Sequence, residues 1–342
     1  MNKTECSVRF LTPAFLGDAN QSAAWRTPPF KAQLRQFWRM VMAGRGRGHG
    51  EIRRIEALLF GHAWLKDEDP RKSRVRLRLD KWQRGTLAGG WPEVGKIENG
   101  KASVDAGLYL GYGAVEYDKN TKGTKLTHAP AIDANQSATL RIGWRNDEDG
   151  QPPQGADALS PALALMNRYG TIGGRSRNGW GSYALESDTL PPLETHACLI
   201  EWREALRDSW AQGIGRDEEG SLVWRTESGE NWQPVMKSLA RLRSDLNQQF
   251  RSSSDRSLLS WPVTKKELPG WGSNDRLPNS LRFKVVEKQG QLHGLVFHVP
   301  CRPKDDSDNN LWGKHPYDQA GLERLWARVH QQLDQNFPRV SA

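Results

Sequence analysis

The spacing of apolar residues divides the N-terminal part of this chain into distinct elements. Cys6, Val8 and Phe10 alternate with less apolar neighbours, which predicts a first strand. Prolines at positions 28 and 29 suit the first turn of a helix, and the apolar residues after them recur at helical spacing. That spacing predicts a long helix whose buried stripe comprises Phe30, Leu34, Phe37, Trp38, Val41 and Met42.

A second helix is predicted over residues 51–60, and a strand over residues 74–80. In that strand three apolar residues alternate strictly with Arg74, Arg76 and Arg78. Because successive side chains of a strand point to opposite faces, one face is predicted to be buried and the other basic.

The rest of the chain mixes short strands with helices. Strands are predicted within residues 102–117, 137–144, 182–185, 258–263, 281–286 and 292–299. Helices are predicted over residues 158–169, 199–210, 234–251 and 320–333. Residues 118–125 are predicted to form an exposed hairpin tip, and Lys237, Arg241 and Arg243 to point outward from their helix. This mixture predicts an α+β fold with helices on one sheet face, and a duplicated βαββαβ unit fits it.

The length of 342 residues is about twice that of a usual domain, so two domains are expected. The run from Ser187 to Pro192 contains two prolines and is the predicted boundary. It separates an N-terminal domain, residues 1–190, from a C-terminal domain, residues 191–342.

The net charge of +9 is concentrated in the N-terminal quarter. Residues 1–90 hold 18 Lys+Arg against 8 Asp+Glu, whereas residues 91–342 hold 31 against 32. This distribution favours a polyanion partner for that quarter. The alternative is a solvated basic face without a partner. Lys31, Arg35 and Arg39 form a row on the long helix with no intervening acid, which costs stability unless an anion lies across it.

Two glycine-containing segments are candidates for contacting phosphates. Residues 45–50 form a basic loop that either tracks a phosphate backbone or is a flexible connector. Residues 170–183 hold five glycines with Arg175 and Arg177 between a helix and a strand, so backbone N–H groups can turn toward an anion. This glycine-rich loop lacks the GxxxxGK[ST] spacing and follows a helix, which disfavours a mononucleotide site.

Other compositional features narrow the class of protein. No targeting segment or membrane span is predicted, and three widely spaced cysteines suit a reducing compartment, so we expect a cytoplasmic protein. The histidines show no metal-binding spacing. We therefore expect neither a cofactor nor a metal.

Three segments occur in the order found in a known family: residues 10–17 (FLTPAFLG), residues 26–39 (RTPPFKAQLRQFWR) with residues 56–61 (EALLFG), and the loop at residues 173–181 (GGRSRNGWG). The chain thereby resembles the RAMP (repeat-associated mysterious protein) superfamily. Within it, the chain is most similar to the first-subunit family of Cmr, type III-B, CRISPR effector complexes.

This resemblance implies two tandem ferredoxin-like domains and RNA binding. It also implies a position where the 3′ side of the guide RNA meets the 5′ side of the target RNA, beside neighbouring RAMP subunits. Cleavage of the target is then expected to belong mainly to a different subunit, so no catalytic residue is predicted.

A protein that holds paired RNA needs only to grip backbone and shape. The aromatic signature of sheet-surface RNA readers is absent, so the RNA is not placed on an aromatic sheet face. We expect instead one RNA groove, with Trp180 either stacking on a base or anchoring the loop in the core. Its predicted residues are Arg26, Lys31, Arg35, Arg39, Arg45, Arg47, Gly173, Gly174, Arg175, Ser176, Arg177, Asn178, Gly179 and Trp180.

Two alternatives remain open. The protein could be a metal-independent endoribonuclease that acts on guide or target RNA with His49 as general acid or base, although no second proton-transfer group is evident. It could also be a structural cap that does not touch RNA.

Overall fold

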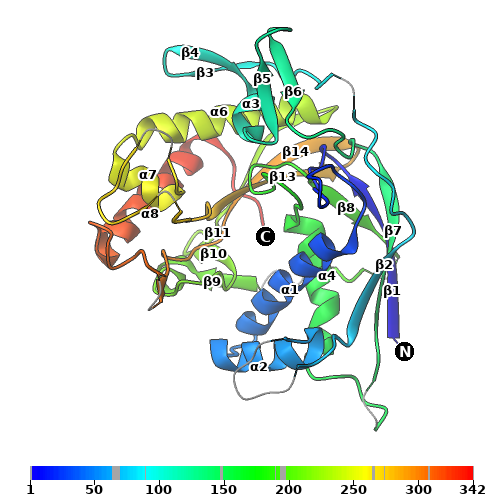
Figure 1. The fold of residues 1–342 in the computed structure, drawn as a ribbon. Helices are drawn as coiled ribbons and strands as arrows, with labels where there is room; N and C mark the ends of the chain where they lie inside the picture. Colours follow the sequence, from blue (N-terminus) through cyan, green and yellow to red (C-terminus); the bar gives the residue numbers. More distant parts are fainter. Residues whose placement is uncertain are drawn as a thin grey trace. The chain divides into compact units, whose positions relative to one another are not determined.

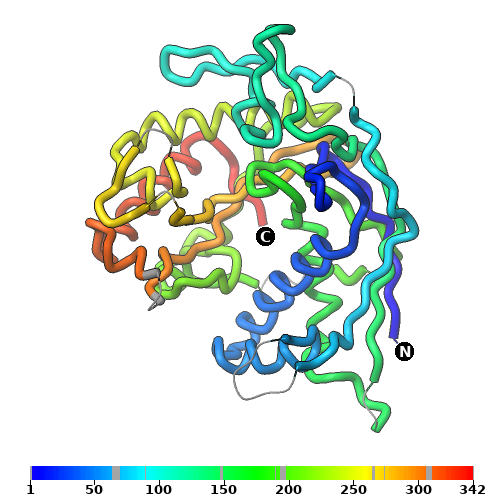
Figure 2. Tube along the Cα trace, viewed as in Figure 1, coloured from blue at the N-terminus to red at the C-terminus, as the bar shows by residue number. Residues whose placement is uncertain are grey.

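The computed structural model describes residues 2–63, 70–88, 90–146, 149–188, 190–192, 198–263, 266–272, 274–306 and 309–341. They form two compact units. Unit 1 comprises Met1–Pro92, Gly111–Ser176 and Trp180–Cys198, and unit 2 comprises Glu93–Leu110, Arg177–Gly179 and Leu199–Ala342. The chain therefore passes from one unit to the other several times. Figure 2 traces its course from the N-terminus to the C-terminus.

Unit 1 is built on a four-stranded antiparallel sheet in the order β2-β7-β1-β8 (Figure 1). The strands are β1 (Asn2–Phe10), β2 (Val75–Leu79), β7 (Ser137–Trp144) and β8 (Tyr183–Glu186). Helix α1 (Thr27–Gly44) and the additional helix α2 (His49–Phe60) lie between β1 and β2, and α4 (Leu159–Tyr169) lies between β7 and β8. Apart from α2 and the segment between β2 and β7, the elements therefore follow a βαββαβ order.

The predicted apolar stripe positions α1 against this sheet. Phe30, Leu34, Phe37, Trp38, Val41 and Met42 are all buried. The ring of Phe30 lies 5.9 Å from that of Tyr183 on β8, which in turn meets Phe10 of β1. The prolines occupy the start of the helix as expected. One face of the sheet is therefore covered by helices, and alternate residues face away from them.

The connection between β2 and β7 contains two hairpins and a short helix. These are β3 (Lys96–Asn99) with β4 (Ala102–Asp105), α3 (Ala106–Gly111), and β5 (Val115–Asp118) with β6 (Gly123–Leu126). The predicted hairpin tip at residues 118–125 is confirmed. The prediction of strands throughout 102–117 is wrong in its middle, because the Asp105 carboxylate accepts the Leu108 N–H at 3.0 Å and starts a helix there.

Unit 2 contains two three-stranded sheets, ordered β11-β10-β9 and β12-β14-β13. The first holds β9 (Leu199–Glu201), β10 (Ile214–Asp217) and β11 (Gly220–Ser221); the second holds β12 (Val223–Gly229), β13 (Leu281–Lys288) and β14 (Gln291–His298). Besides the hairpin β3–β4 given above, unit 2 holds α5 (Trp202–Ala205), α6 (Trp232–Gln249), α7 (Ser253–Leu259), β15 (Asp305–Asp306), β16 (Asn309–Asn310) and α8 (Gln319–Asn336). The α+β prediction is thus confirmed, with most sheet neighbours antiparallel.

Three local predictions in unit 2 are wrong. Residues 199–210 form a strand and one helical turn, because the Glu201 side chain accepts the N–H groups of residues 203 and 204 and separates the two. The strand predicted over 258–263 begins instead as the end of α7, which Ser252 caps. Arg243 does not point outward: it is half-buried and donates to Ser260 Oγ at 3.3 Å, and burial lowers its pKa.

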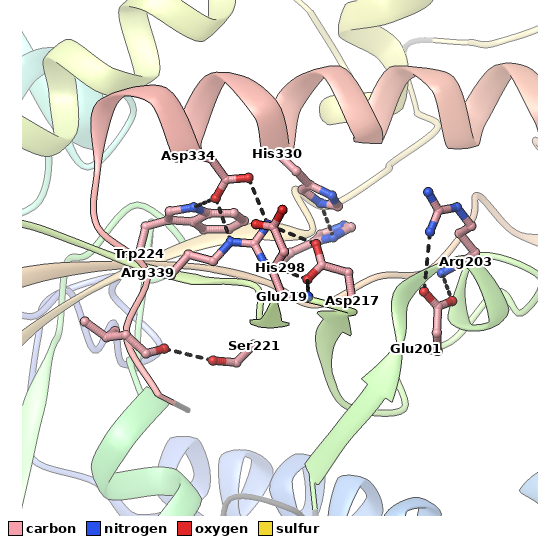
Figure 3. A network of polar contacts seen from close by, with 11 residues as sticks. Glu201, Arg203, Asp217, Glu219, Ser221, Trp224, His298, His330, Asp334 and Arg339 are labelled. Atoms are coloured by element: carbon pink, nitrogen blue, oxygen red, sulfur yellow. Dashed lines mark hydrogen bonds and ion pairs between the residues drawn. The ribbon is translucent and has the colours of Figure 1, made fainter.

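A polar network joins the C-terminal residues of unit 2 to α8 and β10 (Figure 3). Arg339 donates to both carboxylate oxygens of Asp217 and to Asp334, which also accepts the Trp224 indole N–H at 2.8 Å. Burial alone would raise the pKa values of both carboxyls, but the bonds from Arg339 hold them below their usual values. The network therefore fixes the chain end beside β12.

Two buried histidines lie next to this network. His330 Nε2 and His298 Nδ1 are 3.0 Å apart, and the His298 ring stacks on Trp326 at 3.9 Å. Burial lowers the pKa of His330 to about 3 and lowers that of His298 well below its ordinary value. Both rings are therefore neutral in the folded protein at neutral pH.

No helix of the described residues is long and apolar enough to span a membrane. Cys6, Cys198 and Cys301 are free thiols.

The histidine pair predicts acid sensitivity. The pKa values of His298 and His330 are lowered in the folded state, so below about pH 6.5 the unfolded chain takes up protons that the folded chain does not. Each ring then lowers the free energy of unfolding by up to about 1.4 kcal/mol per pH unit. We expect the free energy of unfolding to have its full value above about pH 6.5 and to decrease as the pH falls toward about 4. His330→Gln, which keeps a hydrogen-bonding group without a titrating ring, should flatten the decrease by about one proton. Denaturant unfolding at pH 7.5, 6.0 and 4.5 measures this, and an identical slope in the variant would contradict it.

Candidate functional site

The row of cations on α1 faces an acid that the sequence spacing did not reveal. Glu56 of α2 is 5% exposed and accepts from Arg35 Nη2 at 2.6 Å and from Arg39 Nε at 2.6 Å. The prediction that this row has no acid to pair with is therefore wrong, because the partner comes from the next helix. The side chains of Arg35 and Arg39 nevertheless remain 38% and 45% exposed.

The other predicted basic residues differ: Lys31 is half-buried, whereas Arg45 and Arg47 form exposed ion pairs. Burial, followed by the charge of Arg35, lowers the pKa of Lys31. Arg45 contacts Asp157 at 2.6 Å, and Arg47 contacts Glu51 at 2.7 Å. Ion pairs as exposed as these contribute about 0–1 kcal/mol each, so a phosphate can displace the carboxylates at little cost.

Arg26 and Gln33 connect α1 to two loops of unit 1. Arg26 precedes the helix and donates to the carbonyl oxygen of Gly17. Gln33 donates to the carbonyl of Thr171 at 2.6 Å and accepts the hydroxyl of Tyr183. Since Thr171 lies at the start of the glycine-rich loop, α1 positions that loop directly.

The unit 1 part of the glycine-rich loop is pinned by backbone hydrogen bonds. The N–H of Gly174 donates to Phe15 at 2.9 Å, and the N–H of Gly181 donates to Pro13 at 2.9 Å. Gly181 has φ +63°, and a Cβ there would lie 1.9 Å from the carbonyl oxygen of Ile172. Only glycine fits such an approach.

Trp180 anchors this loop. It is fully buried, with ring centroids 5.5 Å from Phe15 and 5.2 Å from Trp91. Of the two roles considered for Trp180, the structure favours the core anchor over base stacking.

Arg175 lies at the rim of a hollow in unit 1. It is exposed and has φ +55°, a backbone conformation uncommon outside glycine. The hollow has a volume of about 290 Å³ and is lined by Phe15, Gly17, Gln21, Ala23, Gly113, Ala114, His128, Pro130, Gly174 and Arg175. Gln21, Gly113 and His128 were missed by sequence reasoning, because no motif or spacing links them to the loop.

Residues 177–179 of the same loop belong to unit 2. Arg177 is exposed, and its carbonyl accepts the Phe283 N–H at 2.9 Å. Asn178 donates to the carbonyl of Leu110 at 2.8 Å. Burial, followed by the charge of Arg177, lowers the pKa of Arg282 to about 10.

The structure therefore brings only some of the predicted site residues together. Arg26 donates to Gly17 and Gly174 to Phe15, Gly173 lies close to the Phe15 carbonyl, and Arg175 lines the same hollow as Phe15 and Gly17. Arg45 and Arg47 lie beyond the other end of α1, and an 18-residue helix is about 27 Å long. These residues can share one binding surface only if the ligand extends along the whole helix.

No group of three or more His, Cys, Asp or Glu side chains among the described residues is arranged to hold a metal ion. His49 is exposed as the first residue of α2.

Unit 1 is thus an α+β fold in which helices cover one face of a βαββαβ sheet. Its two distinguishing features are the glycine-rich loop, held beside the sheet by backbone hydrogen bonds, and the basic first helix. The model of the RAMP superfamily matches residues 8–184, which span both features. The chain therefore belongs to the RAMP superfamily.

Solved structures give weaker likenesses. The crystal structure of Cmr1 from Pyrococcus furiosus in its apo form has a TM-score of 0.49 and 14% identity, covering 97% of each chain. Two cryo-EM structures of the type III-B Cmr-beta complex bound to cognate target RNA, one of them with AMPPnP and ssDNA, give TM-scores of 0.47 and 0.46 at 11% and 12% identity. Both cover 95% of this chain and 99% of theirs. No curated protein sequence matches the chain significantly.

The close approach at Gly181 gives a direct test of the loop. Gly181→Ala should destabilise the protein by about 2–4 kcal/mol, because the added Cβ meets backbone at a positive φ. Gly174→Ala is the matched control, since its Cβ would make an ordinary 3.4 Å contact with Phe15. Calorimetric unfolding compares the two variants. Equal midpoints would show that the loop is not held as described.

Proposed function

We propose that this protein is a non-catalytic RNA-binding subunit of a type III-B CRISPR (Cmr) effector complex. In this proposal it holds the 3′ region of the guide RNA and the adjacent target RNA, beside neighbouring RAMP subunits in the cytoplasm. The observation that carries the proposal is the glycine-rich loop, which is pinned to residues 13–17 and to α1 and presents exposed Arg175.

Three features of unit 1 support RNA as the ligand. The RAMP superfamily match, residues 8–184, includes the glycine-rich loop and the helices α1 and α4. The cations of α1 and its following loop extend along a surface rather than around a point, which suits a chain of phosphates. Their ion pairs with Asp157 and Glu51 are exposed and therefore exchangeable.

The domain organisation of the proposal is two ferredoxin-like domains, residues 1–190 and 191–342. The βαββαβ order of unit 1 supports the first of these domains. So does its sheet order β2-β7-β1-β8, which is 2-3-1-4 when the four strands are numbered along the chain. For the second, the supporting elements are α6 and the antiparallel sheet β12-β14-β13, while β9, β10 and β11 lie in a separate sheet.

A salt titration tests whether the loop and helix hold RNA. We expect the combined variant Arg45→Ala, Arg47→Ala and Arg175→Ala to weaken binding of a fluorescent guide RNA. Each arginine removed from a phosphate should reduce the slope of log Kd against log salt by about 0.7 for single-stranded RNA, or about 2 in total. Arg175→Lys with Arg45→Lys and Arg47→Lys keeps the charges and is the control. An unchanged slope in the alanine variant would favour a structural cap without RNA contact.

A cleavage assay tests the nuclease alternative. The protein is incubated with guide and target RNA, with and without magnesium, and specific cuts that His49→Ala abolishes would establish a nuclease.

Glu56 should restrain RNA binding by occupying Arg35 and Arg39. Glu56→Gln is expected to lower stability by about 1–2 kcal/mol, because two half-exposed guanidinium groups lose a charged partner. It should also tighten RNA binding and steepen the salt slope by up to about 1.4, as both arginines become available. Glu51→Gln, which releases only Arg47, is the matched control. Unchanged binding and an unchanged salt slope in a folded Glu56→Gln protein would show that this face does not meet RNA.

A further inference from the structure

The sheet of unit 1 has an open face that the glycine-rich loop and α1 do not use. On β1 the buried residues Cys6, Val8 and Phe10 face the helices, so Glu5, Ser7 and Arg9 face the other way. The register pairs Glu5 with Arg141 of β7, and Arg141 with Arg78 of β2. Since cross-strand partners point to the same side, the side chains of Glu5, Arg141 and Arg78 all lie on the open face.

Most charges on this face are balanced. Arg141 binds both carboxylate oxygens of Glu5, and Arg9 contacts Glu186 at 2.9 Å. Arg76 and Arg78 differ: both are exposed, and neither has an ion pair within the described ranges. Arg78 also lies directly opposite Arg141, whose charge is already balanced by Glu5.

The two unbalanced arginines lie on a strand at the edge of the sheet. β2 is the terminal strand in the order β2-β7-β1-β8. Alternate residues of a strand are about 6.6 Å apart, so Arg76 and Arg78 present charges at an interval comparable to successive phosphates of an extended nucleic acid.

Trp82 follows three residues after β2 and is 63% exposed. A tryptophan ring left in water three residues beyond a strand with two exposed arginines supplies, together with them, the two elements of single-strand binding, a cationic track and a stacking platform. Arginines on an edge strand also discourage pairing with other sheets, but an exposed tryptophan would work against that purpose. An acidic protein surface would use the arginines and leave the flat ring without a planar partner.

We propose that Arg76, Arg78 and Trp82 form a second RNA-binding strip, which takes a single-stranded segment of RNA along the edge of the open sheet face. The arginines hold consecutive phosphates, and the Trp82 ring stacks on one base. This strip lies on the sheet face opposite α1, so it does not depend on the function proposed for the glycine-rich loop. It also differs from the aromatic sheet face excluded above, because its ring follows the strand rather than standing on it.

Binding of a fluorescein-labelled 20-nucleotide polyuridine to the full chain tests the strip. Arg76→Ala with Arg78→Ala should weaken binding and reduce the salt slope by about 1.4, which corresponds to two phosphates of single-stranded RNA. Arg216→Ala with Arg241→Ala removes two exposed arginines of unit 2 and should leave the slope unchanged. Trp82→Ala should weaken binding about 5- to 150-fold at an unchanged slope, whereas Trp82→Phe should restore most of the affinity.

Each other result overturns the proposal. An unaltered slope in the Arg76/Arg78 variant, or equal losses in the Arg216/Arg241 control, removes the phosphate contacts. Loss of binding to polyglutamate, with RNA binding intact, assigns the strip to an acidic protein. Aggregation of the Arg76/Arg78 variant, with its soluble fraction binding RNA normally, assigns the arginines to edge protection. If the Arg76/Arg78 variant keeps the full salt slope but the Arg45/Arg47/Arg175 variant loses part of it, the glycine-rich loop proposal stands and the strip does not. If only the Arg76/Arg78 variant loses part of the slope, the strip stands and the loop proposal does not.

Discussion

The close packing of the glycine-rich loop against residues 13–17 is the constraint on which unit 1 depends. Gly181 approaches the carbonyl of Ile172 so closely that no side chain fits, and two backbone N–H groups of the loop are used by Pro13 and Phe15. Trp180 fills the space beneath. Because Gln33 of α1 bonds to the same loop, the basic helix and the loop are held as one surface of the sheet's helical side.

This arrangement places the charges that the proposed RNA-binding function uses. The loop leaves Arg175 exposed in a left-handed conformation at the rim of a small hollow, while Arg45 and Arg47, which follow α1, form exposed ion pairs. Glu56 is the exception: it is buried, so it holds Arg35 and Arg39 in fixed positions along the helix. The acid thus removes the repulsion within the row while leaving a substantial part of both guanidinium groups in solvent.

Sequence reasoning succeeded where one local pattern decides the outcome. The stripe from Phe30 to Met42, the alternation of β2, the strand at residues 137–144 and the hairpin β13–β14 follow from periodicity alone. It failed where a single capping side chain overrides an apolar run, as at Glu201 and Asp105. For the site, the motifs located the loop and α1, but the Glu56 pairing and the contributions of Gln21, Gly113 and His128 depend on residues distant in sequence. Burial of Trp180 likewise depends on Phe15 and Trp91, which no spacing connects to it.

The central claim is that the pinned glycine-rich loop holds an RNA backbone, and photo-crosslinking tests it most directly. Guide RNA carrying 4-thiouridine at successive positions near its 3′ end would be irradiated with the intact protein, and the attached peptides sequenced. The account predicts crosslinks to peptides containing Arg175 and to peptides of α1 containing Lys31 or Arg39, from neighbouring nucleotides. Crosslinks that avoid both segments, while the RNA remains bound, would contradict it.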